Sequence, residues 1–201
     1  ISIERMGGRL GGLIATIPTT IIPASTGIFE RSENGQAFIW AMAVVPMGML
    51  VNAIFLWLWR KVPPSLPPLS NPMRLLAMLA ISLLGWALAA SLGLWLCASQ
   101  QASGVEPLLL GAVTTLILVS TGIGACLADI PAPAGSRRVS IPVLASRGVL
   151  AGVCIVLAVW LSELGLPLLS GIFSVFPAIF LTTMVSLWLS QGESVQAGAV
   201  G

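Results

Sequence analysis

The chain has 201 residues, of which 57% are apolar and only 8% charged, and its formal net charge is +2. A water-soluble domain carries about 25% charged residues, so this chain has too few charges to cover a surface in water. The composition therefore excludes a soluble enzyme, a secreted disulfide scaffold and a disordered protein, and it indicates an all-α polytopic membrane protein. The small net charge also leaves no footprint for nucleic acid, so no such partner is expected.

Runs of apolar residues long enough to cross a membrane divide the chain into spans. About 20 such residues are needed to cross the hydrocarbon core. The expected spans cover residues 10–29, 37–59, 75–97, 107–127, 148–162 and 168–190, and a seventh begins near residue 194. Glu163 and Pro167 mark the boundary between the fifth and sixth spans, because the apolar stretch around them is too long for one crossing. Proline-rich stretches at 62–68 and 129–136 are expected to form loops.

Lysine and arginine residues fall almost entirely on one side of this arrangement. Eight of the nine lie before the first span or in the second and fourth connections, whereas Arg31 lies alone in the first connection. Cytoplasmic segments carry the excess of such residues, so residues 60–74 and 128–147 are predicted to be cytoplasmic and residues 100–106 to face outside. We expect a multi-pass integral protein of the plasma (inner) membrane, with an organellar inner membrane as the alternative.

Four residues at the start of the chain recur in the same order 159 residues later. Glu4, Leu10, Gly12 and Pro18 correspond to Glu163, Leu169, Gly171 and Pro177. An odd number of crossings separates the two copies, so they run in opposite directions, as in an inverted-topology repeat. We expect a first repeat over residues 1–127, a cytoplasmic linker over 128–147 and the start of a second repeat over 148–201, as a fragment of a five-plus-five-span protein. The alternative is chance recurrence of Gly, Pro and Leu in an apolar chain.

Both copies place a proline in the middle of a span, among glycine, serine and threonine residues. Pro18 and Pro177 each remove one backbone hydrogen bond and clash with the carbonyl four residues back. Neighbouring glycines allow the backbone to unwind, and hydroxyl groups can satisfy the carbonyls that are freed. The sequence therefore predicts two proline-broken helices that approach each other near the membrane midplane.

Unwound backbone at these breaks would supply the contacts of a substrate site. The free N–H groups of a half-helix attract anions and its free carbonyls attract cations, so a small solute is expected there, with an anion favoured at the N-terminal ends. The expected contacts are Gly12, Thr16, Pro18, Thr19, Thr20 and Ser25 in the first copy, and Gly171, Ser174, Pro177, Thr182 and Thr183 in the second. The alternative is that the prolines only kink two helices whose small residues pack against neighbours.

The layout resembles inverted-repeat secondary transporters of the bile-acid–sodium symporter and cation–proton antiporter kind. The resemblance rests on the segments around Pro18 and Pro177 and on architecture, not on a diagnostic motif. It implies five-span repeats with broken, crossing helices. Unlike those families, the chain has no Asp or Glu in the middle of a span, so a central carboxylate for a coupling ion is missing.

Two interpretations of function remain open. The first is a secondary transporter that moves a small-molecule substrate by alternating access, and the second is a structural subunit of a larger membrane complex. The chain has no His and no cysteine in a nucleophile context, so it is not expected to be an enzyme, and neither a metal nor a cofactor is expected. Expected partners are membrane lipid, the solute, and a second copy or other membrane subunits. Asn52 is expected to make a helix-packing hydrogen bond.

Overall fold

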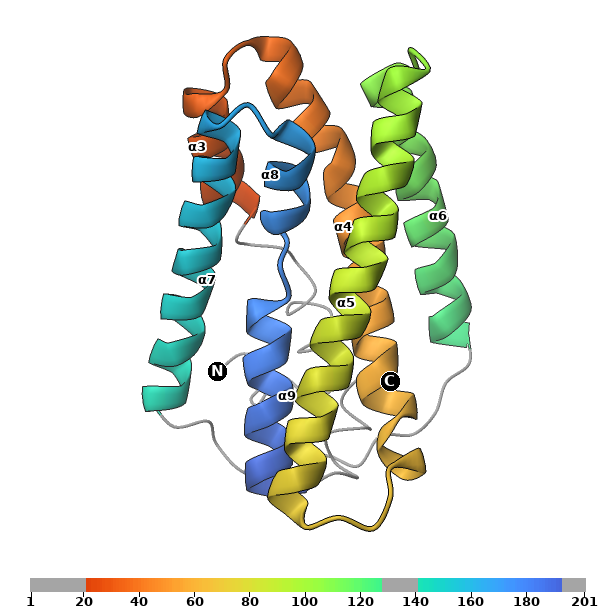
Figure 1. The fold of residues 1–201 in the computed structure, drawn as a ribbon, viewed down its shortest axis with the longest axis vertical. Coiled ribbons are helices and arrows are strands. Elements are labelled where there is room, and N and C mark those ends of the chain that lie inside the picture. Colours follow the sequence, from red (N-terminus) through yellow and green to blue (C-terminus); the bar gives the residue numbers. More distant parts are fainter. Residues whose placement is uncertain (1–20, 128–140, 193–201) are drawn as a thin grey trace.

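The structure is a computed structural model, and it describes residues 21–127 and 141–192. Every regular element in these two ranges is a helix (Figure 1). The expected seventh span lies outside the described residues, as does most of the first span. For the part of the chain that the structure describes, the all-α fold class is confirmed.

The long helices that the structure describes lie side by side, roughly parallel to the long axis of the molecule (Figure 1). They are α3 (Ile21–Arg31), α4 (Gly35–Lys61), the short 3₁₀ helix η1 (Pro63–Ser65), α5 (Asn71–Ala102), α6 (Pro107–Leu127), α7 (Ile141–Glu163), α8 (Pro167–Phe173) and α9 (Ala178–Gln191). Four single helices and the combined segment Pro167–Leu189 are long and apolar enough to cross a membrane. These five helices indicate a multi-pass membrane protein.

The described helices overlap the expected spans in the middle of the chain, and α5 and α7 extend clearly beyond them. α6 begins at Pro107, the expected first residue of the fourth span, and a proline is well placed in the first turn of a helix. α5 has 32 residues and is about 48 Å long, so it exceeds a hydrocarbon core of about 30 Å. α7 begins at Ile141, so the last residues of the expected linker, 141–147, are helical. Ser146 and Arg147 are polar, so a prediction from apolar runs alone did not include this stretch in a helix.

The core of the described bundle is centred on α4. This helix packs against α5, α6 and α8, and its side chains Phe55 and Trp59 are fully buried. The outward faces of α6 and α7 are apolar and exposed, as at Leu108 and Val149. Exposed apolar faces on long helices suit contact with lipid chains, so these faces mark the periphery of the bundle.

The two ends of the bundle differ in charge. α4 ends and α5 begins at the lower end in Figure 1, and this end carries Arg60, Lys61 and Arg74. The Nη2 atom of Arg74 donates to the carbonyl of Pro63 at 2.8 Å, so a basic side chain holds the proline-rich loop. At the upper end Arg31 pairs with Glu163, with 2.8 Å between Nη1 and Oε1.

Candidate functional site

The segment expected as the sixth span is interrupted. α8 ends at Phe173 and α9 begins at Ala178, and residues 174–177 join them about half-way along the bundle (Figure 1). Pro177 has no N–H to continue the α-helical ladder. Hydrogen bonds between residues three apart replace the four-residue spacing of the α-helix. The N–H of Val175 donates to Ile172 at 3.3 Å, and the N–H of Phe176 donates to Phe173 at 3.1 Å. The backbone therefore turns between two half-helices.

The interruption is buried, and a side chain from α4 satisfies one of its carbonyls. The Asn52 Nδ2 atom donates to the carbonyl of Val175 at 2.6 Å, and the Asn52 Oδ1 atom accepts from Trp86 Nε1 at 3.0 Å. In a continuous helix the Val175 carbonyl would accept from residue 179. Here the first turn of α9 is closed by the N–H of Leu181, which donates to Pro177 at 2.8 Å. Asn52 thus supplies a donor that the broken helix lacks, in a place where water is scarce.

Aromatic rings enclose the same turn from the side of α5. The ring of Trp86 meets Phe176 edge-on with 4.8 Å between centroids, and it meets Phe173 in the same way at 6.0 Å. Edge-to-face pairs of this kind are worth about 0.5–1.5 kcal/mol beyond the area they bury. On this side the turn faces packed protein, so a solute would have to approach it from another side.

α8 is held against its neighbours by very close backbone packing. A Cβ added at Gly171 would overlap the backbone carbonyl of Ala41 in α4. On the facing surface of α4, a Cβ added at Gly48 would collide with the side chain of Val175. The hydroxyl of Ser170 donates to the carbonyl of Ala158 in α7 at 2.7 Å. The structure therefore gives Gly171, one of the expected site residues, a packing role.

The hydroxyl groups expected to bind substrate all donate, where they are described, to a backbone carbonyl three or four residues earlier in the chain. Ser25 donates to Ile22 at 2.9 Å, Ser174 to Gly171 at 2.7 Å, Thr182 to Ala178 at 2.9 Å and Thr183 to Ile179 at 2.6 Å. A hydroxyl that donates in this way still has lone pairs that can accept a hydrogen bond. Gly12, Thr16, Pro18, Thr19 and Thr20 lie outside the described residues.

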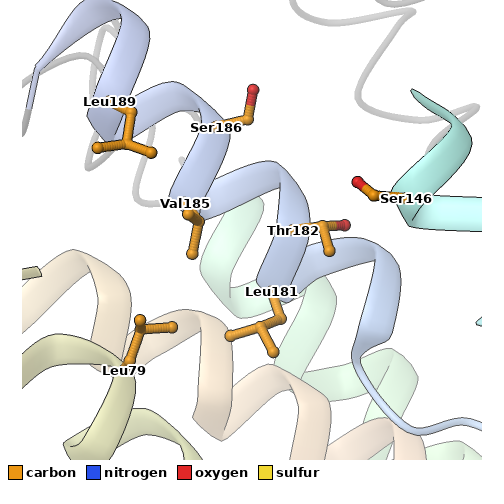
Figure 2. Close-up of a pocket in the computed structure, with 7 residues that line it drawn as sticks. All are labelled: Leu79, Ser146, Leu181, Thr182, Val185, Ser186 and Leu189. Carbon is orange, nitrogen blue, oxygen red and sulfur yellow. The ribbon is translucent and has the colours of Figure 1, made fainter. Parts of the chain in front are cut away.

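A groove of about 270 Å³ lies below the interruption, between α9, α7 and α5 (Figure 2). Its lining residues are Leu79, Ser146, Leu181, Thr182, Val185, Ser186 and Leu189. Thr182 and Ser186 stand one turn apart on one face of α9, and Figure 2 shows Ser146 of α7 across the groove from them. The lining combines hydroxyl groups with apolar walls and includes no charged side chain. Most of the surface that lines the groove is apolar, and the hydroxyl groups contribute a small share of it.

Two of these hydroxyl residues were missed by the analysis of the sequence. Ser146 fell in the expected linker, and Ser186 lay beyond the residues adjoining Pro177. The spacing of four between Thr182 and Ser186 was the available signal, because residues at that spacing share one helix face. Ser146 carried no such signal, since its position opposite α9 depends on the fold.

Comparison with known proteins gives no match, whether with protein-family models, curated proteins or solved structures. Within the described residues no three His, Cys, Asp or Glu side chains come together in a group that could hold a metal ion. A larger hollow of about 460 Å³ beside α4 and α5 is lined almost wholly by apolar side chains. The interruption at 174–177 and the hydroxyl-lined groove below it are therefore the candidate site.

Proposed function

We propose that this chain is a secondary transporter, or the core of one, which moves a small polar solute along the face of α9. The observation that carries the proposal is the interruption of the chain at residues 174–177 inside a bundle of long apolar helices. Unsatisfied backbone at membrane depth costs several kcal/mol, so such a break is found where protein or a water-filled cavity supports it. Asn52 supports one side of this break, and the groove lies on another.

The chemistry of the groove favours a solute with hydrogen-bonding groups. Ser146, Thr182 and Ser186 offer hydroxyl oxygens from two helices, and Leu181 and Val185 supply apolar walls. The groove begins in the first turns of α9, whose N-terminal end carries a partial positive charge of about half a unit. A solute with an anionic group would gain from that field, as the sequence led us to expect.

Alternating access would require the two proline-broken helices of an inverted repeat. The recurrence of Gly12 and Pro18 as Gly171 and Pro177 supports that arrangement. In such transporters the site lies at the interface of the repeats near the midplane, where Thr16, Thr19 and Thr20 would join the contacts. The basic residues at the lower end of the bundle favour a cytoplasmic position for that end.

A structural subunit of a membrane complex is the second candidate. The close approach of Gly171 to Ala41 favours it, because helix packing alone accounts for a small residue at this contact. The intrahelical bonds of Thr182 and Thr183 favour it too, since these hydroxyls need no solute as a partner. The two candidates differ in whether the groove is used.

Uptake by the full chain in reconstituted vesicles separates them. The labelled probes would be glycerol, lactate and inorganic phosphate, which span neutral and anionic small solutes. We expect uptake of at least one probe above that of protein-free vesicles, and a loss of about twofold to tenfold in its apparent affinity for each hydroxyl removed by Thr182→Val or Ser186→Ala.

The matched control is Thr121→Val. The hydroxyl of Thr121 also donates within its own helix, to Ile117 at 2.9 Å, but it lies on α6, away from the groove. This variant should transport like the parent chain. Equal uptake by all three variants, or no uptake of any probe, would favour the structural subunit.

A further inference from the structure

α3 and α7 form a parallel pair whose contacts share one register. A Cβ added at Gly27 would lie 2.6 Å from a methyl group of Val159. The hydroxyls of Ser32 and Ser162 are 3.1 Å apart. Together with the pair of Arg31 and Glu163, these contacts join residues whose numbers differ by 130 to 132.

The described part of this interface ends at Ile21, where the described residues begin, although α7 continues. The register places Ile21, the first residue of α3, level with residues 151–153, whereas α7 extends on to Ile141. The face of α7 that meets α3 continues downward through Gly152 and Gly148, at helical spacings of three and four. Apart from the backbone of α7 itself and the residues next to each glycine, no atom of the described residues lies within 4 Å of a Cβ added at either position.

We propose that residues 10–20 of the same chain dock on this lower face of α7, as a continuation of the α3–α7 interface. The register pairs Gly148 with residues 16–18 and Gly152 with residues 20–22. It also pairs Ile141, where α7 begins, with residues 9–11, close to Leu10, where the apolar run of the first span begins. The length of chain before α3 therefore matches the length of α7 that extends below its contacts with α3.

The residue types on both sides suit such an interface. Gly148 and Gly152 stand four apart, a spacing that lets two membrane helices approach closely. The proposed docking segment, residues 10–20, contributes Gly11, Gly12 and Ala15, which are also small. Without a hydrophobic driving force in lipid, close packing of small residues is a main source of helix association.

The docking would bring the two prolines of the repeat to one level. α7 also runs antiparallel to α8 and α9: Ser170 bonds to Ala158, and Thr182 faces Ser146 across the groove. The antiparallel register of these pairs places Pro177 level with residue 151. The parallel register of α3 and α7 would place Pro18 beside residues 148–150. Both levels lie near the middle of α7. The docking does not depend on transport, since it would hold equally in a structural subunit.

Cross-linking of the full chain tests the docking. In a chain with Cys97, Cys126 and Cys154 replaced by alanine, a protease site is inserted at residues 67–70, an exposed stretch of the loop after α4. Pairs of new cysteines are then oxidised in membranes, and the chain is cleaved and run without reductant. The test pair is Ile17→Cys with Gly148→Cys. A pair of Gly27→Cys with Val159→Cys reports that the described interface has formed.

We expect both pairs to hold the two cleavage fragments together. A control pair of Ile17→Cys with Leu150→Cys should not, because Leu150 lies about 200° around the helix from Gly148. Failure of the test pair, while the Gly27 and Val159 pair still cross-links, would overturn the docking. A cross-linked dimer formed by Gly148→Cys alone would also overturn it and would assign the face to a second copy of the chain.

Discussion

The two halves of the interrupted span, α8 and α9, are held in different ways. α8 is short and fixed along its length: Ser170 bonds to α7, Gly171 lies against the backbone of α4, and Ile172 is fully buried. α9 is fixed by single side chains: Met184 is buried in the core, and at the far end Trp188 Nε1 donates to Asn71 Oδ1 at 2.9 Å and the Trp188 ring packs on Trp59. Between the interruption and Trp188, one face of α9 borders the groove.

This difference shows what the interruption achieves. In one continuous helix, the close packing of α8 would also fix the positions of the residues that face the groove. The turn at 174–177 separates the two halves, and Asn52 fixes the turn itself. The groove therefore lies beside a half-helix that is anchored at both ends and has one face on the core and another on the groove. Changes to the anchors should cost stability, and changes along the groove should not.

The largest effect is expected from Asn52→Leu. This change removes the donor to the Val175 carbonyl and the acceptor of the Trp86 N–H, both of which are buried. Each stranded group should cost about 1–3 kcal/mol, so the variant should unfold at markedly lower temperature in detergent. Asn52→Asp keeps the acceptor but loses the donor, and it should be no more stable than Asn52→Leu. A melting curve unchanged from the parent chain in Asn52→Leu would contradict the role of this side chain.

A smaller loss is expected from Gly171→Ala. The added Cβ would overlap the carbonyl of Ala41, and because the obstacle is backbone, α8 or α4 has to shift. Overpacking of this kind costs about 1–3 kcal/mol. Gly122→Ala is the matched control, since Gly122 lies in a helix with open space around it and alanine should be neutral or slightly stabilising there. Equal melting temperatures for the two variants would show that α8 and α4 are not closely packed.

The smallest effect is expected at the upper end, from Glu163→Gln. This change removes the ion pair with Arg31, whose side chain is 62% exposed. Exposed pairs contribute about 0–1 kcal/mol, so the melting temperature should move little and should respond to salt in the parent chain only. A large loss of stability would mean that the Arg31–Glu163 pair at the upper end, and not the contacts of α8, is the main support of this part of the bundle.

The sequence predicted those features that depend on local chemistry. The apolar runs gave the spans that became α4 and α6, because span length and hydropathy are read residue by residue. The start of α7 was placed too late, since Ser146 and Arg147 are polar although they lie within the helix. The partner of Asn52 could not be predicted at all, because it lies 123 residues away and depends on how α8 packs against α4.

The candidate site was predictable in the same limited sense. Proline chemistry drew attention to Pro177, and the adjoining threonines belong to the first turns of α9. Whether those threonines line a groove depends on which face of α9 is left uncovered, and the order of apolar residues does not determine that. Thr182 lines the groove with Ser146 and Ser186, whereas Thr183 is not among the lining residues.

Thiol labelling at residue 182 tests the central claim most directly. With the native cysteines replaced by alanine, Thr182→Cys would be exposed to a charged, membrane-impermeant thiol reagent applied from the side of Arg60 and Lys61. The account predicts that this thiol reacts, because water and solute would enter the groove of the proposed transporter, while Thr121→Cys on α6 stays unmodified. An inert thiol at residue 182, in a chain that melts like the parent, would contradict the proposal that solute passes along α9.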